Sequence, residues 1–256
     1  MKQKTRIVIV GASSAIAEHC ARQWAEQAAH NGHQTLQFVL LGRDQNKLDA
    51  IAADLSVRNP AATSETLCAD FSSAEAIGKT VSGIVAGGAP DIVLIAHGTL
   101  PDQQLCQQDL QLAADAMHIN GLSPMLFAEA FAGHMQAANS GTIAIIGSVA
   151  GDRGRRSNYV YGAAKGLVTR YAQGLQHRLA VTGVRVVLIK PGPTDTPMTA
   201  HLKQDGASLA RVEDVAALIV RGVSKGSPVI YAPGKWWLIM MIIRHLPRFV
   251  FNKMDI

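Results

Sequence analysis

The chain has 256 residues and a formal net charge of +5 at neutral pH, from 24 Lys and Arg against 19 Asp and Glu. Residues 1–220 contain as many acidic as basic side chains, so the surplus lies at the C-terminal end. That end holds Arg221, Lys225, Lys235, Arg244, Arg248 and Lys253 against one acid, Asp255. Nucleic-acid-binding domains usually carry a basic stripe through the domain body, which argues against nucleic acid as a partner.

The remaining composition is typical of a folded protein of a reducing compartment. Hydrophobic residues make up 48% of the chain and charged residues 17%, which is too apolar for disorder. Cys20, Cys68 and Cys106 have neither metal-ligand spacing nor the even number of a disulfide framework, so no metal site is predicted. The N-terminus lacks a long apolar signal core, and no run reaches the roughly 18 apolar residues of a membrane span. We therefore expect a cytoplasmic protein.

Short apolar runs alternate with segments of helical period along the chain. In order, the sequence predicts strand Arg6–Val10, helix Ala15–His30, strand Leu36–Leu41, helix Gln45–Val57, a weaker strand at Glu65–Cys68, helix Ala74–Val85, strand Asp91–Ile95, helix Leu110–Ala138, strand Thr142–Ile146, helix Val160–Val181, strand Arg185–Ile189, helix Val212–Ser224 and strand Pro228–Tyr231. Continuously apolar strands are typical of strands covered on both faces. The alternation predicts an α/β fold with a Rossmann-like, doubly wound parallel sheet of about seven strands in three α/β/α layers.

No repeat or Pro/Gly/Ser-rich linker interrupts this alternation. We therefore expect a single domain over residues 1–256 that ends in a basic, apolar segment at residues 233–256.

The turn after the first strand has the features of a nucleotide site. Gly11 permits a tight turn, and Ser13 and Ser14 can cap the following helix and donate to a phosphate. The three-glycine spacing of dinucleotide folds is missing, since Ala15 and Ala17 replace glycines. Small residues that merely pack a strand against a helix remain the alternative.

The end of the second strand indicates which dinucleotide binds. Dinucleotide folds place an acid there to hold a ribose 2′-hydroxyl, or a base to hold a 2′-phosphate. Arg43 occupies the position of the base, and Asp44 follows it. NADP(H) is therefore favoured over NAD(H), and the alternative is that Arg43 is a surface charge at a helix start.

The segment 147–165 contains residues suited to carbonyl reduction. Ser148 follows a predicted strand, at the edge of the sheet where ligands bind in such folds. Tyr161 and Lys165 are four residues apart on a helix and share a face. A nearby ammonium favours the phenolate, so we expect a lowered pKa for Tyr161. Tyr161 would give a proton to the carbonyl oxygen, and Ser148 would hydrogen-bond that oxygen. The alternative is a half-buried tyrosine beside a solvated lysine.

Residues 5–232 resemble the short-chain dehydrogenase/reductase family. The interval from Ser148 to Tyr161, the Tyr161-x-x-x-Lys165 pair, the placement of Asn120 before Ser148 and the segment 191–196 after the sixth strand all match its pattern. The resemblance implies that Asn120, Ser148, Tyr161 and Lys165 are catalytic, with Asn120 supporting a water-linked proton path to Lys165. It also implies cofactor binding by Gly11, Ser13, Ser14, Ile16, Arg43, Asp70, Ala96, Gly98, Tyr161, Lys165, Pro191, Gly192, Thr194 and Thr196, among which Asp70 would contact the adenine.

The sequence departs from the family pattern after the fourth strand. The family's Asn-Asn-Ala-Gly is replaced by residues 95–98, which read Ile-Ala-His-Gly. Family contacts there are made largely through the backbone, so cofactor binding should survive. For His97 a hydrogen-bonded structural role is the first expectation, and contact with substrate or cofactor is the second.

A finer resemblance is to the reductases that convert a polyprenyl-phosphoryl 2-keto-ribose into the arabinose epimer for cell-wall synthesis. It rests on the first turn, on Leu-Gly-Arg-Asp after the second strand, on residues 151–158 and on the apolar basic C-terminal segment. Arg153, Arg155 and Arg156 would then hold a substrate phosphodiester, whereas a solvated loop is the alternative. Other candidate functions are reduction of a soluble sugar, steroid-like or acyl ketone, and a non-catalytic NADP-binding sensor. A homo-dimer or homo-tetramer is expected.

The segment after Tyr231 carries eight consecutive apolar residues, 236–243, bounded by Lys235 and Arg244. A helix of that length extends about 12 Å, too short for a bilayer core. Three interpretations remain open: a helix packed over the substrate pocket, a contact between subunits, or a peripheral anchor on the inner face of the cell membrane.

Overall fold

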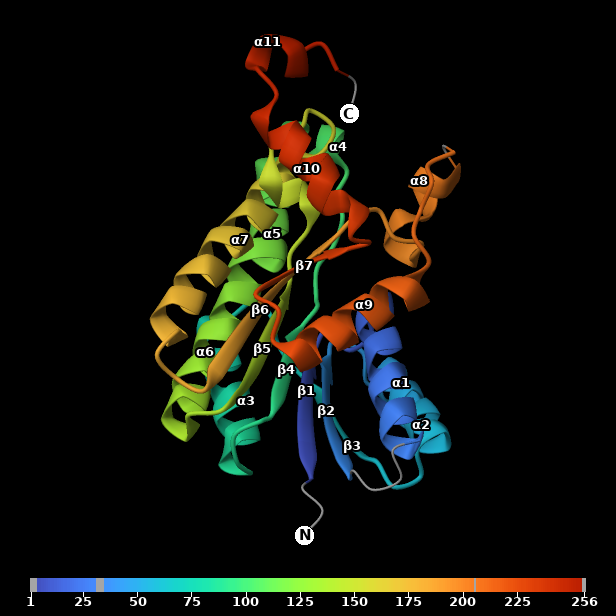
Figure 1. Ribbon diagram of the computed structural model, residues 1–256, viewed down its shortest axis with the longest axis vertical. Coiled ribbons are helices and arrows are strands. Elements are labelled where there is room, and N and C mark those ends of the chain that lie inside the picture. Colours follow the sequence, from blue (N-terminus) through green and yellow to red (C-terminus); the bar gives the residue numbers. More distant parts are fainter. Residues whose placement is uncertain (1–3, 31–34, 205, 255–256) are drawn as a thin grey trace.

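The described residues form a seven-stranded, all-parallel sheet with helices on both faces (Figure 1). The structure is a computed structural model that describes residues 4–30, 35–204 and 206–254; Asp255, which entered the charge comparison, lies outside them. The strands are β1 (Thr5–Val10), β2 (Leu36–Gly42), β3 (Thr63–Cys68), β4 (Ile92–Ile95), β5 (Gly141–Ile146), β6 (Val184–Pro191) and β7 (Val229–Ala232). Their order in the sheet is β3-β2-β1-β4-β5-β6-β7, which confirms the predicted fold class.

Two helical layers cover the sheet. One layer contains α1 (Ala15–His30), α2 (Gln45–Arg58) and α9 (Val212–Lys225), and the other contains α3 (Ala74–Ala86), α5 (Leu110–Met117), α6 (Ser123–Ala138) and α7 (Tyr159–Leu179) (Figure 1). In β1, Ile7 and Ile9 face the first layer while Val8 and Val10 face the second. Because successive strand residues point to opposite faces, covering both faces requires an uninterrupted apolar run.

The edge strand β3 is polar by comparison. Its first three residues are exposed, and it pairs only with β2 among the described strands. Its weak signal in the sequence follows from this edge position, which buries fewer side chains.

The predicted helix over residues 110–138 is interrupted. A π-helical turn at His118–Leu122 separates α5 from α6 and contains Asn120. The Asn120 side chain donates to the carbonyl of Ala116 at 2.9 Å and accepts from the amide of Thr99 at 2.9 Å. The apolar pattern of residues 110–138 predicted one continuous helix and did not reveal the π-turn. π-turns in helices often occur at functional sites.

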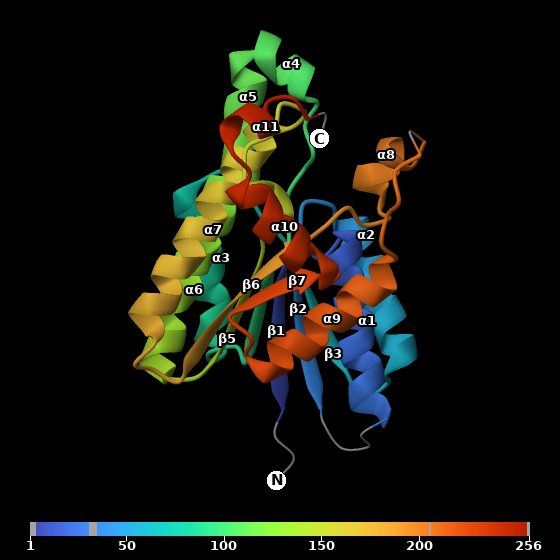
Figure 2. The same cartoon turned by 45° about the horizontal axis from the view of Figure 1, so that its top comes forward.

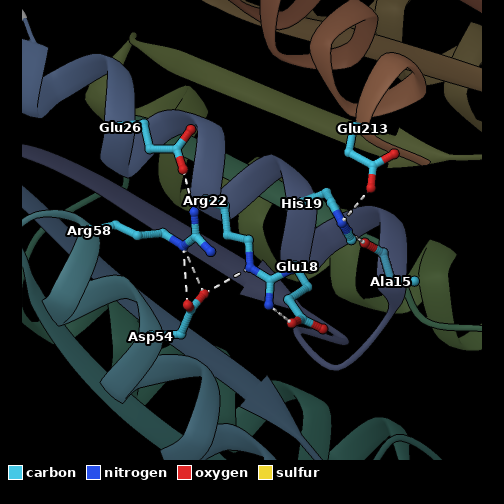
Figure 3. Close-up of polar contacts among 8 residues, drawn as sticks. All are labelled: Ala15, Glu18, His19, Arg22, Glu26, Asp54, Arg58 and Glu213. Atoms are coloured by element: carbon cyan, nitrogen blue, oxygen red, sulfur yellow. Dashed lines mark hydrogen bonds and ion pairs between the residues drawn. The ribbon is translucent and has the colours of Figure 1, made fainter. Parts of the chain in front are cut away.

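A polar network ties α1 to its neighbours in the first layer (Figure 3). Arg22 of α1 donates to Asp54 of α2 at 2.8 Å, and Arg58 donates to the same carboxylate at 3.0 Å. His19 lies 3.5 Å from Glu213 at the start of α9. These contacts fix α1, whose N-terminus faces the cleft described below.

The C-terminal segment forms α10 (Lys235–His245) and α11 (Arg248–Phe251), which lie beyond the carboxyl ends of the strands (Figures 1 and 2). Met240 of α10 is fully buried, and the indole of Trp236 lies directly against the backbone of Gly192. One face of α10 therefore packs on the fold. No helix in the described part of the chain is long and apolar enough to cross a membrane.

Candidate active site

The candidate site is a cleft at the carboxyl ends of the strands. It lies where the chain leaves the neighbouring strands β1 and β4 toward opposite edges of the sheet. It has two adjoining parts. The catalytic cavity is lined by Asn120, Ser148, Tyr161 and Lys165, and the nucleotide groove is lined by Gly11, Ser13, Arg43 and Phe71. The two parts share Ser14, Ile16, His97, Gly98, Thr196 and Met198 as lining residues.

The floor of the nucleotide groove is the turn between β1 and α1. Gly11 has φ +83°, and a Cβ there would lie 2.6 Å from the amide nitrogen of His97. A side chain at this position would strain the turn and push β4's end away from β1. The turn directs the first-turn amides of α1, which lack acceptors within the helix, toward the groove.

Arg43 and Asp44, adjacent in sequence, have different roles. Asp44 caps α2, since its carboxylate accepts from the amide of Lys47 at 3.2 Å and lies 3.8 Å from the ammonium of Lys47. Arg43 lines the groove, whereas Asp44 does not. The groove therefore presents a guanidinium at the place where a ribose 2′-substituent binds in dinucleotide folds.

Glu18 also lines the groove and was not anticipated from the sequence. It forms an ion pair with Arg22, which in turn bonds to Asp54 (Figure 3). This pairing offsets the negative charge of Glu18 in the wall of the groove.

Ser148 is held by close packing of a 3-10 turn, η2 (Val149–Asp152), on α7. The Ser148 hydroxyl accepts from the amide of Ala150 at 3.1 Å. A Cβ on Gly151 would lie 2.6 Å from the backbone of Lys165, so this glycine lets the turn approach the helix. The approach brings Ser148 to the same cavity as Tyr161 and Lys165.

The side chains of Tyr161 and Lys165 are strongly affected by burial. Burial raises the pKa of Tyr161 to about 12, while hydrogen bonding with Ser148 acts in the opposite direction. Burial lowers the pKa of Lys165 to about 8. The lysine ammonium donates to the Ile146 carbonyl at 3.1 Å and lies 5.8 Å from the tyrosine ring centroid. The expected lowering of the Tyr161 pKa is therefore wrong, because desolvation of the buried phenol raises its pKa.

Asn120 lies beside Lys165 in the wall of the catalytic cavity. It is fully buried, and a Cβ on Gly98 would lie 2.7 Å from its side-chain oxygen and 3.7 Å from the Lys165 ammonium. Gly98 thus leaves open the space between these two groups. The Asn120 side chain, which projects from the π-turn, forms one wall of this space.

His97 lines both parts of the cleft and packs against aromatic side chains behind it. Its Nε2 lies 3.0 Å from the Ser123 hydroxyl, and its ring packs edgewise on Phe71 and Phe127. Burial, and then the charges of Lys165 and Arg43, lower the pKa of His97 to about 3. The imidazole is therefore neutral at physiological pH and hydrogen-bonded, in agreement with a structural role, although it also lines the cleft.

The segment between β6 and α9 forms the outer wall of the cleft. Thr194 donates to the Gly192 carbonyl at 2.9 Å and is buried. Thr196 caps a short 3-10 turn, η3 (Pro197–Thr199), that leads into α8 (Ala200–Gln204). Pro191, Gly192, Thr194 and Thr196, all predicted to contact the cofactor, line the catalytic cavity.

The three arginines predicted to bind substrate occupy different surroundings in the structure. Arg155 lines the catalytic cavity, whereas Arg153 and Arg156 do not. Arg153 instead donates to the carbonyls of Ile243 and Leu246 and lies 3.7 Å over the Phe251 ring, so it fastens the C-terminal segment. Its prediction as a substrate ligand is not supported, because its hydrogen bonds are made to α10 and the turn after it.

Asp70 lies two residues after β3, and it is outside the lining of both parts of the cleft. Its carboxylate accepts from the amide and the hydroxyl of Ser72 at 2.7 and 2.6 Å. Among the residues missed from the sequence, Leu100, Asn158, Met198 and Leu202 line the catalytic cavity. The position of Asn158, three residues before Tyr161 at the start of the same helix, was the available signal.

The comparisons with known proteins agree with this geometry. A family model described as short chain dehydrogenase matches residues 5–207. The chain belongs to the short-chain dehydrogenase/reductase family. This oxidoreductase family binds NAD(P), and the residues around the nucleotide groove fit such a dinucleotide: a helix N-terminus for the diphosphate, a glycine turn and a guanidinium.

Relatives of this short-chain dehydrogenase extend over nearly the whole chain. An uncharacterized oxidoreductase of Mycobacterium tuberculosis is 32% identical over 249 residues, which cover 97% of this chain and 96% of the relative. Another from Streptomyces coelicolor is 29% identical over 251 residues, with 97% and 95% coverage. A short-chain dehydrogenase from Sphingobium yanoikuyae, solved in complex with NADPH, superimposes with a TM-score of 0.81 at 23% identity, covering 98% of this chain and 96% of that one. The bulky-bulky ketone specific alcohol dehydrogenase of Comamonas testosteroni has a TM-score of 0.78 at 22% identity, with 98% and 95% coverage.

Proposed function

We propose that this dehydrogenase reduces a ketone to a secondary alcohol with NADPH. The observation that carries the proposal is that Ser148, Tyr161 and Lys165 line one cavity continuous with the groove that holds Arg43. NADPH bound in the nucleotide groove would supply a hydride to the carbonyl carbon. Tyr161 gives its phenolic proton to the carbonyl oxygen, and its raised pKa keeps that proton in place at neutral pH. Ser148 hydrogen-bonds the same oxygen. Lys165 and Asn120 lie on the path by which Tyr161 regains its proton.

Arg43 is proposed to select NADPH over NADH. Arg43→Ala should raise the Kd for NADPH roughly 10- to 100-fold, the effect of losing a charge-assisted contact to the 2′-phosphate, and leave the Kd for NADH nearly unchanged. Fluorescence titration with both dinucleotides measures this difference. Lys47→Ala, one turn further along and paired with Asp44, is the matched control. Equal losses for both dinucleotides would contradict the assignment.

We further propose that the ketone carries an anionic group, as in a polyprenyl-phosphate-linked keto-sugar reduced at the inner face of the cell membrane. Arg155 supports this. Its Nε is buried without a hydrogen-bond partner among the described residues, and no Asp or Glu lines the catalytic cavity. Burial lowers the pKa of Arg155, an effect that Asp152 opposes. The oxygen of Asn158, also buried without such a partner, can accept from a substrate hydroxyl. A desolvated cation of this kind is stabilised when an anionic substrate group pairs with it.

NADPH oxidation with a panel of ketones tests both proposals. Arg155→Met should raise KM for phosphate-bearing ketones roughly 10- to 100-fold and leave that for neutral ketones nearly unchanged. Arg156→Met, on the exposed side of the same loop, is the control. Turnover of neutral ketones that is equally sensitive to Arg155 would reject the anion assignment. No oxidation of NADPH with any ketone would reject the reductase itself.

A further inference from the structure

The outer face of the C-terminal segment is apolar. On α10, Trp237, Leu238 and Ile242 are 55%, 51% and 55% exposed, whereas Met240 is buried. On α11 and just after it, Phe249, Val250 and Met254 are exposed as well. We call these six side chains the tail surface. A surface helix that packs one face on its fold normally turns polar residues outward, but α10 exposes these three large apolar side chains as well.

Unpaired basic residues surround the tail surface. Lys235, Arg244, Arg248 and Lys253 are exposed, and none of them forms an ion pair within the described residues. The sequence has no Asp or Glu from residue 215 to residue 254. Elsewhere in the fold exposed arginines such as Arg58 and Arg178 do have carboxylate partners. Four of the six basic residues after residue 220 therefore lie on α10, on α11 or just after it, and the other two, Arg221 and Lys225, lie on α9.

The combination of exposed apolar side chains with basic residues distinguishes between two possible partners of the tail surface. A second copy joined by a two-fold axis would set the same patch against itself and bring like charges together without a carboxylate to separate them. An anionic lipid surface instead attracts each base and accepts the apolar side chains, and tryptophan favours the headgroup region. We propose that the tail surface docks on the surface of an anionic lipid membrane, lying along it without crossing it.

The docked surface is continuous with the walls of the cleft. Trp236 rests on Gly192, which lines the catalytic cavity, and Arg153, which follows the turn after Ser148, donates to the Leu246 carbonyl at 2.8 Å. In both views α10 and α11 lie beyond the carboxyl ends of the strands (Figures 1 and 2), and the residues that line the cleft lie at the same ends. A docked molecule thus holds its catalytic cavity close to the bilayer. Delivery of a lipid-linked ketone to that cavity rests on the proposed function; the docking itself does not.

Flotation of the full chain with lipid vesicles tests the docking. We expect binding to vesicles that contain phosphatidylglycerol, little binding to pure phosphatidylcholine vesicles, and release by salt. Arg244→Glu with Arg248→Glu should lower the partition coefficient roughly tenfold or more, because each base near an anionic surface contributes to binding. Trp237→Ser with Ile242→Ser should lower it to a similar extent. The controls are Arg170→Glu and Val57→Ser with Val181→Ser, exposed sites on other faces.

Two outcomes would overturn the proposal. One is the absence of flotation with anionic vesicles by the folded wild-type chain, checked by circular dichroism and NADPH binding. The other is an oligomer, seen by light scattering, that the Trp237 and Ile242 substitutions dissociate, which would make the tail surface a subunit interface. Reductase activity on soluble ketones is assayed in parallel, so failure of docking and failure of the proposed reaction are told apart.

Discussion

Tyr161→Phe is expected to lower kcat for ketone reduction by roughly 10²- to 10⁴-fold, the usual contribution of a positioned general acid. The substitution removes one oxygen from a side chain that lines the cavity and leaves its ring in place. Because burial holds the phenol pKa at about 12, the wild-type group is a protonated donor throughout the neutral range. NADPH binding, measured by fluorescence, should change little.

Tyr159→Phe provides the matched control for this measurement. It lies on the same helix, its side chain is 44% exposed, and it does not line the catalytic cavity. Its kcat should equal that of the wild type. Undiminished turnover in Tyr161→Phe, with Tyr159→Phe as reference, would mean that another group donates the proton.

Asp152→Ala is expected to reduce the free energy of unfolding by about 3–5 kcal/mol, the effect of leaving a buried charge without its partner. Asp152 pairs with Lys190, and the two side chains are only 2% and 5% exposed. The Tyr231 hydroxyl donates to the other carboxylate oxygen at 2.8 Å. This cluster joins the turn after Ser148 to β6 and β7. Lys190 itself lies two residues before Gly192. Urea unfolding of the wild type and the variant measures the loss.

Two further variants distinguish a buried charge from a general packing defect. Asp152→Leu combined with Lys190→Met removes both charges, so much of the lost stability should return. Glu75→Ala breaks the ion pair with Lys79, in which both side chains are 77% exposed, and should change the unfolding free energy by about 0–1 kcal/mol. A loss in Asp152→Ala no greater than that in Glu75→Ala would contradict the buried pairing.

The strands and the family could be predicted from the sequence because both depend on residue patterns within short segments of the chain. Strands such as β1 and β6 are covered on both faces and therefore appear as continuous apolar runs. The Tyr161 and Lys165 pair lies on one helix, so its spacing alone predicts a common face. Ser148 could be added because strand ends in parallel sheets meet at one edge.

Features that depend on contacts between distant segments were not accessible in this way. The π-turn at Asn120 is supported by Thr99, from the loop after β4, as well as by its own helix. The identical charges of Arg153 and Arg155 gave no means of separating them, and only the packing of α10 draws Arg153 away from the cleft. The direction of the Tyr161 pKa was also misjudged, because desolvation depends on every atom around the phenol.

The charge surplus shows the same difference between what the sequence determines and what depends on the tertiary structure. The sequence by itself determined that the excess lies after residue 220, among apolar residues and on an otherwise neutral chain. It also determined the succession of strands and helices along the chain, which follows from periodicity, whereas the catalytic set was implied by the resemblance of its motifs to the short-chain dehydrogenase/reductase family. Only the tertiary structure decided which face of α10 is buried, which arginine lines the cleft and that Lys190 pairs with Asp152. Each of these depends on desolvation and on contacts across the fold, which linear order does not contain.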